Sequence, residues 1–535
     1  MERLLMKKTK ISYQQTGYFS KLIIDYLDQN EGLKSFYNEF SNLESFQKTI
    51  ERRKEYPLNR GVLVEALNQQ NVGFEISEKS KQHIRNLEKE NCFTVTTGHQ
   101  LNLFTGPLYF IYKIVSAINL AKVLKEKYPE NDFVPVYWMA TEDHDFEEVN
   151  HFNLFKKKYQ LANTKNGAVG HLRLGGVEEL LSELKDDLGD RNGAQEIIDL
   201  FSKFYKSSNT YAAAIKGIVN QLFGKYGLVI VDGDDKVLKG LFSDEFKQEL
   251  VSPINYKHIT NSSQKLKDLG FKPQLSPREI NIFYLDEGLR ERIVFEEGVY
   301  KVLNTEIQFS ATEMLDELEN HPEKFSPNAP MRCLYQEKIL PNLAYIGGGG
   351  ELAYWFQLKE MFDANTISYP TLVLRNSVLF VDKGSLKKYT KLGLEPSDLF
   401  REIETLIKDY LKNGSDVVLE LNEEEQLVHT VFNAIVDKAE LVDASLSPMI
   451  KAELQKSLKS IKNIENRLIK AEKKKEEVGV NQLKGLKEKL FPNSSLQERH
   501  DNLISILLFY GEEVIDELIA TLNPLDNEFT ILTAN

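Results

Sequence analysis

The chain has 535 residues, of which 41% are hydrophobic and 27% are charged, and its formal net charge is −13. This length exceeds what one compact core usually supports, so we expect two to four domains. The negative charge argues against a general nucleic-acid-binding protein, because phosphate contacts need concentrated lysine and arginine. No apolar run approaches the roughly 20 residues of a membrane span. The first residues also lack the apolar core of a signal peptide, so we expect a cytoplasmic protein without membrane or nucleic-acid partners.

The first 151 residues predict short helices followed by a strand, a helix and a second strand. Short helices are expected around residues 19–27, 43–55 and 77–91. A β-rich run then ends at Thr97, and Thr105 and Pro107 are suited to the N-cap and first turn of the next helix. A second apolar run, residues 134–140, leads into the sequence TEDHD.

Further strands are expected at residues 228–232, 342–346 and 371–374, and within residues 275–310. At least five strand ends carry polar or glycine-rich residues, and helical patterns separate several of them. This alternation predicts an α/β fold, a Rossmann-like, doubly wound core. We place the core in residues 1–384, with insertions at about 152–220 and 240–330.

The pattern changes after about residue 383. Apolar residues 450, 454, 458, 461, 464 and 468 follow a 3-4 spacing among many lysines and glutamates. A narrow stripe of this kind, with a short break near Gly479, predicts an α-helical coiled coil or antiparallel hairpin over residues 385–490. Residues 491–535 are expected to return to the core as a helical segment.

The turn after the first strand contains residues suited to anion binding. Gly98, His99 and Gln100 follow the strand, and Thr105 and Gly106 precede the helix. Backbone N–H groups and a helix N-terminus favour a phosphate or another anion there. The alternative is a structural turn, in which glycine adopts the required backbone conformation and the histidine lies on the surface.

The segment after the second strand contains Glu142, Asp143, His144 and Asp145. These residue types bind divalent ions or supply a general base whose pKa is set by crowding of like charges. Because neighbouring side chains on an extended segment point to opposite sides, Asp143 would pair with Asp145 and Glu142 with His144. The alternative is a polar loop in which Asp143 caps a helix.

Two other strand ends carry weaker signals. Residues 347–350 are four glycines before Glu351, which lets the backbone approach a ligand closely. Their spacing matches neither a dinucleotide fingerprint nor a P-loop, and a structural turn is equally compatible. The sequence DGDD at residues 232–235 has the composition of a turn, which we favour over a metal site. The two cysteines, Cys92 and Cys333, imply no disulfide framework and are expected to be structural.

Together these residues resemble the cysteine-adding enzyme family of bacillithiol biosynthesis. The matching pieces are TGHQLNLFTGPLYFIYK, PVYWMATEDHDFEEVNH, FGKYGLVIVD, FSPNAPMRCLYQEKILPNLAYIGGGGELAYWFQL and LFPNSSLQERHDNL, in this order between about residues 92 and 504. The resemblance implies a ligase that joins L-cysteine to the amino group of glucosaminyl malate. It also implies a core similar to class I aminoacyl-tRNA synthetases and other nucleotidyl transferases, and a homodimer formed through the coiled coil. ATP is the expected cofactor, and Mg²⁺ is compatible with it.

Two hypotheses from different classes follow. In the first, a ligase, Glu142, Asp143, His144 and Asp145 are the catalytic residues. The substrate- or nucleotide-binding residues would then be Gly98, His99, Gln100, Thr105, Gly106, Gly347, Gly348, Gly349, Gly350, Glu351, Trp355 and Arg375, and no metal ligand is assigned. The second is a dimeric binding or scaffold protein with an inherited nucleotide-transferase core. A metal-dependent hydrolase using the acidic cluster is a further alternative.

Overall fold

The computed structural model describes residues 6–162, 167–414 and 420–534. The chain forms two compact units. The first contains Met1–Leu379 and Leu496–Leu532, and the second contains Phe380–Ser495 and Thr533–Asn535.

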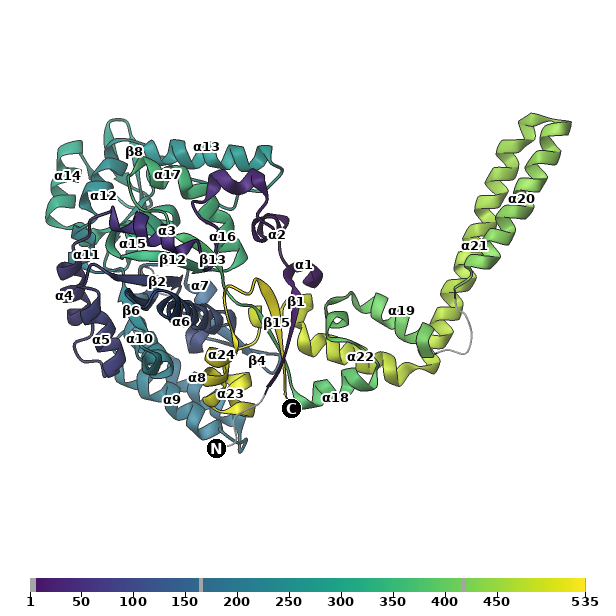
Figure 1. The fold of residues 1–535 in the computed structure, drawn as a ribbon, viewed down its shortest axis with the longest axis horizontal. Helices are drawn as coiled ribbons and strands as arrows, with labels where there is room; N and C mark the ends of the chain where they lie inside the picture. The colour runs from purple at the N-terminus through teal and green to yellow at the C-terminus, as the bar shows by residue number, and fades with distance from the viewer. Residues whose placement is uncertain (1–5, 163–166, 415–419, 535) are drawn as a thin grey trace. The chain divides into compact units, whose positions relative to one another are not determined.

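The first unit is built on a five-stranded parallel sheet with the order β13-β12-β2-β3-β6 (Figure 1). Its strands are β2 (Cys92–His99), β3 (Asp132–Met139), β6 (Val229–Asp232), β12 (Asn342–Gly347) and β13 (Thr371–Leu374). The prediction of a doubly wound α/β core is confirmed. The chain adds β3 and β6 on one side of β2, and then adds β12 and β13 on the other side. The strand order therefore reverses between β2 and β12, which is where open α/β sheets bind their ligands.

Helices cover both faces of this sheet. On β3, the ring of Tyr137 lies 5.3 Å from Phe110 of α6 (Tyr109–Lys127), and the ring of Trp138 lies 5.2 Å from Tyr335 of α15 (Ala329–Ile339). Successive side chains of a strand point to opposite faces. α6 and α15 therefore pack on opposite faces, and burial on both sides explains why β3, β6 and β13 are mostly apolar.

The remaining helices and strands of the first unit precede, interrupt or follow this core. Before it lie β1 (Met6–Ser12), α1 (Tyr13–Thr16), α2 (Lys21–Leu27), α3 (Phe46–Lys54), α4 (Arg60–Gln70) and α5 (Glu78–Asn86). Between β3 and β6 lie α7 (Phe146–Val149), β4 (His151–Leu154), β5 (Lys157–Gln160), α8 (Val177–Leu188), α9 (Ala194–Ser207) and α10 (Tyr211–Phe223). α16 (Gly349–Trp355) and α17 (Lys359–Ala364) lie between β12 and β13, and α23 (Ile504–Tyr510) and α24 (Glu513–Thr521) follow β13 in the chain. β14 (Val378–Val381) and β15 (Glu528–Ala534) each contain residues of both units.

A second sheet is inserted between β6 and β12. It is antiparallel, with the order β10-β9-β8-β7-β11. The inserted elements are α11 (Lys236–Gly240), α12 (Ser243–Val251), α13 (Ile254–Asp268), β7 (Ile282–Asp286), β8 (Leu289–Glu296), β9 (Val299–Val302), β10 (Gln308–Phe309), α14 (Ala311–Asn320) and β11 (Phe325–Pro327). The predicted strands within residues 275–310 are therefore confirmed.

The predicted start of α6 is wrong. The helix begins at Tyr109, and its N-cap, Leu108, has no side-chain capping bond. Thr105 instead lies in a tight turn with a φ of 68°. The side-chain amide of Asn502 donates to the carbonyls of Phe104 and Gly106, both at 2.7 Å. A residue almost 400 positions away thus holds the loop in this conformation, so local sequence could not reveal it.

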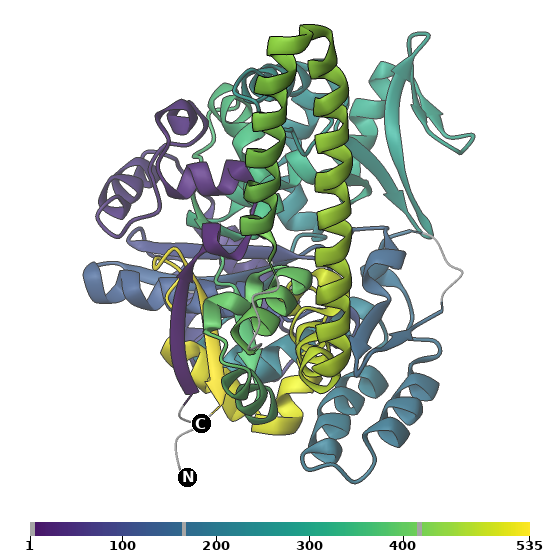
Figure 2. The ribbon, with the colours of Figure 1, turned by 90° about the vertical axis from the view of Figure 1, so that its right-hand side faces the viewer.

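The second unit is helical. It contains α18 (Lys383–Lys391), α19 (Ile403–Gly414), α20 (Asn422–Val442), α21 (Ser447–Lys475) and α22 (Glu477–Leu490). α20 and α21 run antiparallel side by side, joined at one end (Figures 1 and 2), which confirms the predicted helical hairpin. Within the described residues, no helix is both long and apolar enough to span a membrane.

The predicted position of the hairpin turn is wrong. The chain reverses at residues 443–446, where the Asp443 side chain accepts from the Ser445 N–H at 2.8 Å and Pro448 lies in the first turn of α21. Gly479 lies inside α22, and the Tyr410 ring occupies the space that a Cβ would need there. That glycine is explained by close packing and not by a turn.

Candidate active site

A cavity of about 650 Å³ lies at the carboxyl ends of the parallel strands, where the strand order reverses. This volume and position are typical of a small-molecule site. The register explains the convergence, because His99 of β2 pairs with Met139 of β3. The predicted site residues that line the cavity are Gly98, His99, Gln100, Glu142, Asp143, His144, Gly348, Gly349, Gly350, Glu351 and Arg375.

Five predicted site residues lie outside the lining of this cavity: Thr105, Gly106, Asp145, Gly347 and Trp355. Thr105 and Gly106 are buried in the loop before α6, and Asp145 is exposed. Trp355 is fully buried, with its ring 4.6 Å from that of Tyr345. The structure therefore gives Trp355 a packing role. The prediction failed because the apolar pattern of a helix does not distinguish a core residue from a site residue.

An ion pair between the buried Lys113 and the partly buried Glu351 joins α6 to the glycine loop, residues 347–350. The ammonium of Lys113 lies 2.7 Å from Oε2 of Glu351 and donates to the carbonyl of Gly98. Glu351 also accepts from the Tyr345 hydroxyl at 2.8 Å and from the Gly348 N–H at 2.9 Å. Although burial favours the neutral acid, Lys113 and the Gly348 N–H hold the pKa of Glu351 at about 2. Glu351 is thus an ionised carboxylate that fixes the loop.

Lys113 was not predicted as a site residue. It lies within the apolar run FIYKIVSAINLA and is almost fully buried. A lysine in such a run is the signal that could have revealed it, since a buried ammonium needs a partner.

His99 is a neutral imidazole that is partly buried and lines the cavity. Its ring centre lies 5.4 Å from that of Tyr109 and 5.3 Å from that of Phe110. Burial and, to a smaller extent, the nearby Lys113 ammonium lower the pKa of His99 to about 3. The side-chain amide of Asn102 donates to Nε2 at 2.8 Å, which leaves the ring proton on Nδ1. His99 therefore offers the cavity a neutral donor and not a cation.

Glu142 is tied to a second buried lysine. The ammonium of Lys239 on α11 lies 2.7 Å from Glu142 and 2.7 Å from Asp234, and it donates to the Glu323 carbonyl at 2.8 Å. Asp234 also accepts from Nε2 of His171 at 2.5 Å. Burial raises the pKa of Glu142, and the Lys239 ammonium opposes that shift. The predicted pairing of Glu142 with His144 is replaced by this lysine-centred network.

The remaining acidic residues after β6 have structural partners. Asp235 caps α11 by accepting from the N–H groups of Val237 and Leu238. No group of three or more His, Cys, Asp or Glu side chains suited to a metal ion occurs in the part of the chain that the structure describes.

Asp143 is the partly exposed carboxylate of the acidic segment in the cavity. It is 30% exposed, and it accepts from Nε2 of Gln100 at 2.8 Å and from the Asp145 N–H at 3.2 Å. Within residues 6–162, 167–414 and 420–534 it forms no ion pair with a lysine or arginine. Asp143 is therefore free to bind a cationic group or to accept a proton.

His144 is held by an arginine of the inserted sheet. An N–H of Arg290 donates to Nδ1 of His144 at 2.7 Å, and other guanidinium N–H groups donate to the Ser326 hydroxyl at 2.9 Å and the Pro327 carbonyl at 3.1 Å. Burial and the Arg290 charge lower the pKa of His144. Since Nδ1 is already an acceptor, His144 is a poor candidate for the general base.

Three arginines that sequence reasoning missed also line the cavity: Arg290, Arg332 and Arg499. Arg332 donates to Gln336 at 3.1 Å and to the Tyr354 hydroxyl at 3.3 Å. Among the described residues, no carboxylate lies within 4 Å of any of these three guanidinium groups. The cavity therefore carries uncompensated positive charge, which favours carboxylate or phosphate groups of a ligand.

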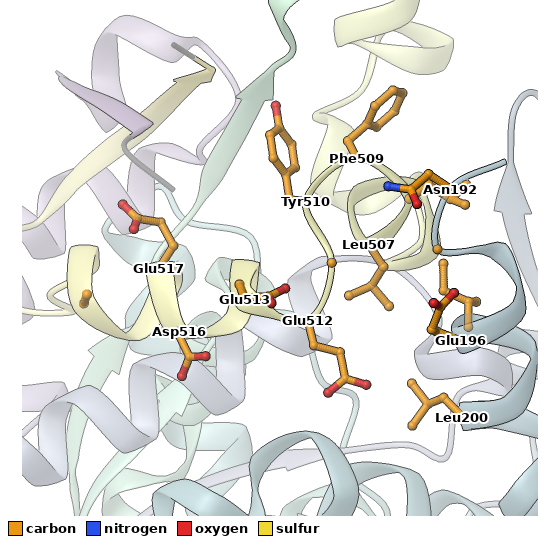
Figure 3. Close-up of a pocket in the computed structure, with 15 residues that line it drawn as sticks. Asn192, Glu196, Leu200, Leu507, Phe509, Tyr510, Glu512, Glu513, Asp516 and Glu517 are labelled. Atoms are coloured by element: carbon orange, nitrogen blue, oxygen red, sulfur yellow. The ribbon is translucent and has the colours of Figure 1, made fainter. Parts of the chain in front are cut away.

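A larger cavity of about 1110 Å³ lies elsewhere in the first unit, between α9 and the segment from Leu507 to Ala520. Its walls carry Glu196, Glu512, Glu513, Asp516 and Glu517 beside apolar residues (Figure 3). Its lining contains no lysine or arginine, so its charge is unsuited to an anionic ligand. We therefore place the candidate active site at the strand ends.

Comparisons with known proteins agree with this architecture. Residues 6–376 match the family model described as "Bacillithiol biosynthesis BshC, N-terminal Rossmann-like domain", and residues 378–534 match "Bacillithiol biosynthesis BshC, C-terminal coiled-coil domain". Relatives named "Putative cysteine ligase BshC" include one from Flavobacterium johnsoniae, 47% identical over 525 residues, covering 98% of this chain and 99% of the relative. One from Christiangramia forsetii is 45% identical over 529 residues, covering 98% of each chain. One from Bacillus cereus is 28% identical over 531 residues, covering 96% of this chain and 97% of the relative. The chain belongs to the BshC family of bacillithiol biosynthesis.

Proposed function

We propose that this protein is an amide-forming ligase that joins L-cysteine to the amino group of glucosaminyl malate, which completes bacillithiol. The observation that carries the proposal is the cavity at the point where the strand order reverses. It combines one partly exposed carboxylate, Asp143, with three arginines that have no carboxylate within 4 Å among the described residues. The proposed acceptor has matching chemistry, because it carries an amino group and the carboxylates of malate. The name of the relatives, a cysteine ligase, supports the same reaction class.

Asp143 is the residue that we assign to the amine. Only the neutral amine is a nucleophile, so an amine bound as an ammonium must lose a proton before it attacks the cysteine carbonyl carbon. Asp143 binds the ammonium and accepts that proton. The C–N bond then forms as the activated carboxylate loses its leaving group. Holding both reactants in one cavity supplies much of the rate enhancement, because the reacting groups are already close and oriented.

ATP is the proposed source of activation, because amide synthesis from a free carboxylate is uphill. The residues fit a polyanion. Arg332 and Arg499 line the cavity without a carboxylate partner, and the buried Nε of Arg375 has no hydrogen-bond partner in the described part of the chain. Of these residues, Arg332 and Arg375 would hold the phosphates. The described residues offer no three-ligand cage for Mg²⁺, so we derive no step from a protein-bound metal.

We also propose that the protein is a homodimer formed through the helical hairpin. On α20, Leu427, Val431 and Ile435 are exposed and follow one another at intervals of four residues. They therefore lie on one face of the helix. Such a stripe is typical of a helix that packs against a partner.

The test is mass spectrometry of the purified protein with glucosaminyl malate, L-cysteine and ATP, together with omission of each component. Bacillithiol formed only in the complete mixture, with AMP or ADP rising in step, supports the ligase. Asp143→Asn should lower product formation by at least about 100-fold, the usual contribution of a general base, with an unchanged melting temperature. Glu147→Gln, a carboxylate-to-amide change on the exposed side of α7 outside the cavity, is the matched control. Wild-type turnover in Asp143→Asn would rule out this assignment.

A further inference from the structure

The segment of residues 496–502, LQERHDN, returns to the first unit and contributes to the active-site cavity. We name it the return segment. It lies within LFPNSSLQERHDNL, one of the pieces that resemble the family. In the proposed reaction, Arg499 is the one residue of this segment with a role. Its contacts show that it is fixed at two points, with an exposed arginine between them.

Glu498 is the first anchor. It is fully buried, its Oε1 lies 2.7 Å from a guanidinium nitrogen of Arg375, and its Oε2 accepts from the Val378 N–H at 3.1 Å. Despite burial, this carboxylate raises the pKa of Arg375, so the guanidinium stays charged. Glu498 thereby ties the return segment to the carboxyl end of β13.

Asn502 is the second anchor. It is fully buried, and its amide donates to the carbonyls of Phe104 and Gly106, both at 2.7 Å. The neighbouring Asp501 carbonyl accepts from the Leu108 N–H at 2.9 Å. The loop it holds is strained, because Phe104 and Thr105 have φ values of 48° and 68°. Asn502 thereby ties the return segment to the loop after β2.

Arg499 lies between these anchors. Its N–H donates to the Leu496 carbonyl at 2.9 Å in a short 3₁₀ turn, while its side chain is exposed and lines the cavity. No carboxylate lies within 4 Å of its guanidinium among residues 6–162, 167–414 and 420–534. A charged side chain on a fixed backbone loses less conformational freedom when it binds a ligand.

We infer that Arg499 is a specificity-determining residue that binds an anionic group of the substrates, and that Glu498 and Asn502 position it. This inference rests on the proposed function. The shared chemistry is a carboxylate or phosphate oxygen that accepts charge-assisted hydrogen bonds. Its sources among the substrates are the malate carboxylates, the L-cysteine carboxylate and the phosphates of ATP.

The first experiment compares Arg499→Ala and Arg499→Lys with wild type by measuring kcat and the KM for each substrate. A lost hydrogen bond to a charged group should raise the KM of the substrate that Arg499 binds by about 10- to 100-fold. Lysine should restore part of the loss, because it keeps the charge and loses the two-pronged geometry. Arg85→Ala, an exposed arginine of α5 outside the cavity, is the control and should match wild type.

The KM values also identify the source of the anion. A rise confined to glucosaminyl malate assigns Arg499 to the malate, a rise confined to L-cysteine assigns it to the cysteine carboxylate, and a rise confined to ATP assigns it to the phosphates. A rise for more than one substrate supports a shared contact. Unchanged KM values for all three substrates, or a fall in kcat alone, overturn the inference.

The positioning role is tested with a double-mutant cycle. Asn502→Ala should raise the same KM in the wild-type background and have little further effect in the Arg499→Ala background, because its target is already absent. A merely structural effect would add in both backgrounds and would overturn the positioning role. If Asn502→Ala does not fold, Glu498→Gln serves in the same cycle.

Calorimetric titration separates this inference from the proposed function. A wild type that binds neither glucosaminyl malate nor ATP and makes no product contradicts both. A wild type that makes bacillithiol and is matched by Arg499→Ala contradicts only the inference.

Discussion

Lys239 is the residue whose replacement tests the electrostatics of the site most directly. Its side chain is 0% exposed, and its ammonium lies 2.7 Å from both Glu142 and Asp234. Lys239→Met keeps most of the side-chain volume and removes the charge. Two largely buried carboxylates are then left without their common cation.

The expected loss of stability follows from this burial. Removing one partner of a buried ion pair costs about 3–5 kcal/mol, because the remaining charge is left uncompensated. A typical domain is stable by about 5–15 kcal/mol, so the loss should be large. Lys236→Met is the matched control on the same helix. Lys236 is 58% exposed and pairs with Glu323 at 3.1 Å, and exposed pairs contribute about 0–1 kcal/mol.

Tryptophan fluorescence during urea unfolding reports on the first unit, which contains Lys239. The chain has two tryptophans, Trp138 and Trp355, and both are buried in the first unit. Lys239→Met should lower the free energy of unfolding of that unit by about 3–5 kcal/mol at pH 8, and Lys236→Met by less than about 1 kcal/mol. A change below about 1 kcal/mol in Lys239→Met would refute the reasoning.

The pH dependence gives an independent check. Without the ammonium, burial raises the folded-state pKa of Glu142 further above its unfolded value of 4.5. A carboxyl with a raised folded pKa binds more protons in the folded state, so its penalty is absent below the unfolded pKa and grows as the pH rises through the folded pKa. The destabilisation of Lys239→Met should therefore be smaller at pH 5 than at pH 8. An equal loss at both values would contradict the assignment to these carboxylates.

Three further predictions concern other parts of the molecule. Desolvation of its ring and the Lys113 ammonium lower the pKa of His99 to about 3, so its imidazole NMR signals should not titrate between pH 8 and pH 5; a midpoint near 6.5 would contradict this shift. Val431 is 57% exposed on α20, and Val431→Glu should shift the proposed homodimer to the single-chain mass of 61.5 kDa in light scattering; a persisting dimer would exclude this face. Gly479→Ala should lower the melting temperature, because its Cβ collides with Tyr410, whereas Gly485→Ala on the same helix has free space and should preserve or raise it; equal effects would contradict the packing argument.

The core of the fold could be predicted because its signals are local. Apolar runs with β-branched residues end in glycine or charged residues, as in the run before Gly98 and the run before Gly347. Parallel strands align their carboxyl ends, so residues that follow different strands meet at one edge of the sheet. The meeting of Gly98–Gln100, Glu142–His144 and Gly348–Glu351 around one cavity follows from this rule alone.

The roles of the individual residues could not be predicted in the same way. The sequence identified four candidate catalytic residues in a row, but their partners come from distant segments. Lys239 on α11 forms an ion pair with Glu142, and Arg290 on β8 donates a hydrogen bond to His144. Neither α11 nor β8 is close in sequence to residues 142–145. Of the acidic residues in this run that line the cavity, Asp143 alone has no lysine or arginine within ion-pair distance in the described part of the chain. Residue type thus predicts what a side chain can do, whereas long-range packing decides whether it is available.

Lys113 shows which sequence signal could narrow this gap. A lysine inside an apolar helix must either reach water or meet a carboxylate, because burying an unpaired ammonium costs several kcal/mol. The helix containing Lys113 is apolar on nearly every side, so the ammonium cannot reach water. The partner must then come from the facing strand ends, where Glu351 is the acidic residue after the glycine run. A charged residue in an apolar helix therefore predicts an oppositely charged partner that is distant in sequence. Here it indicates that Glu351 binds Lys113 and fixes the loop, and does not bind a substrate.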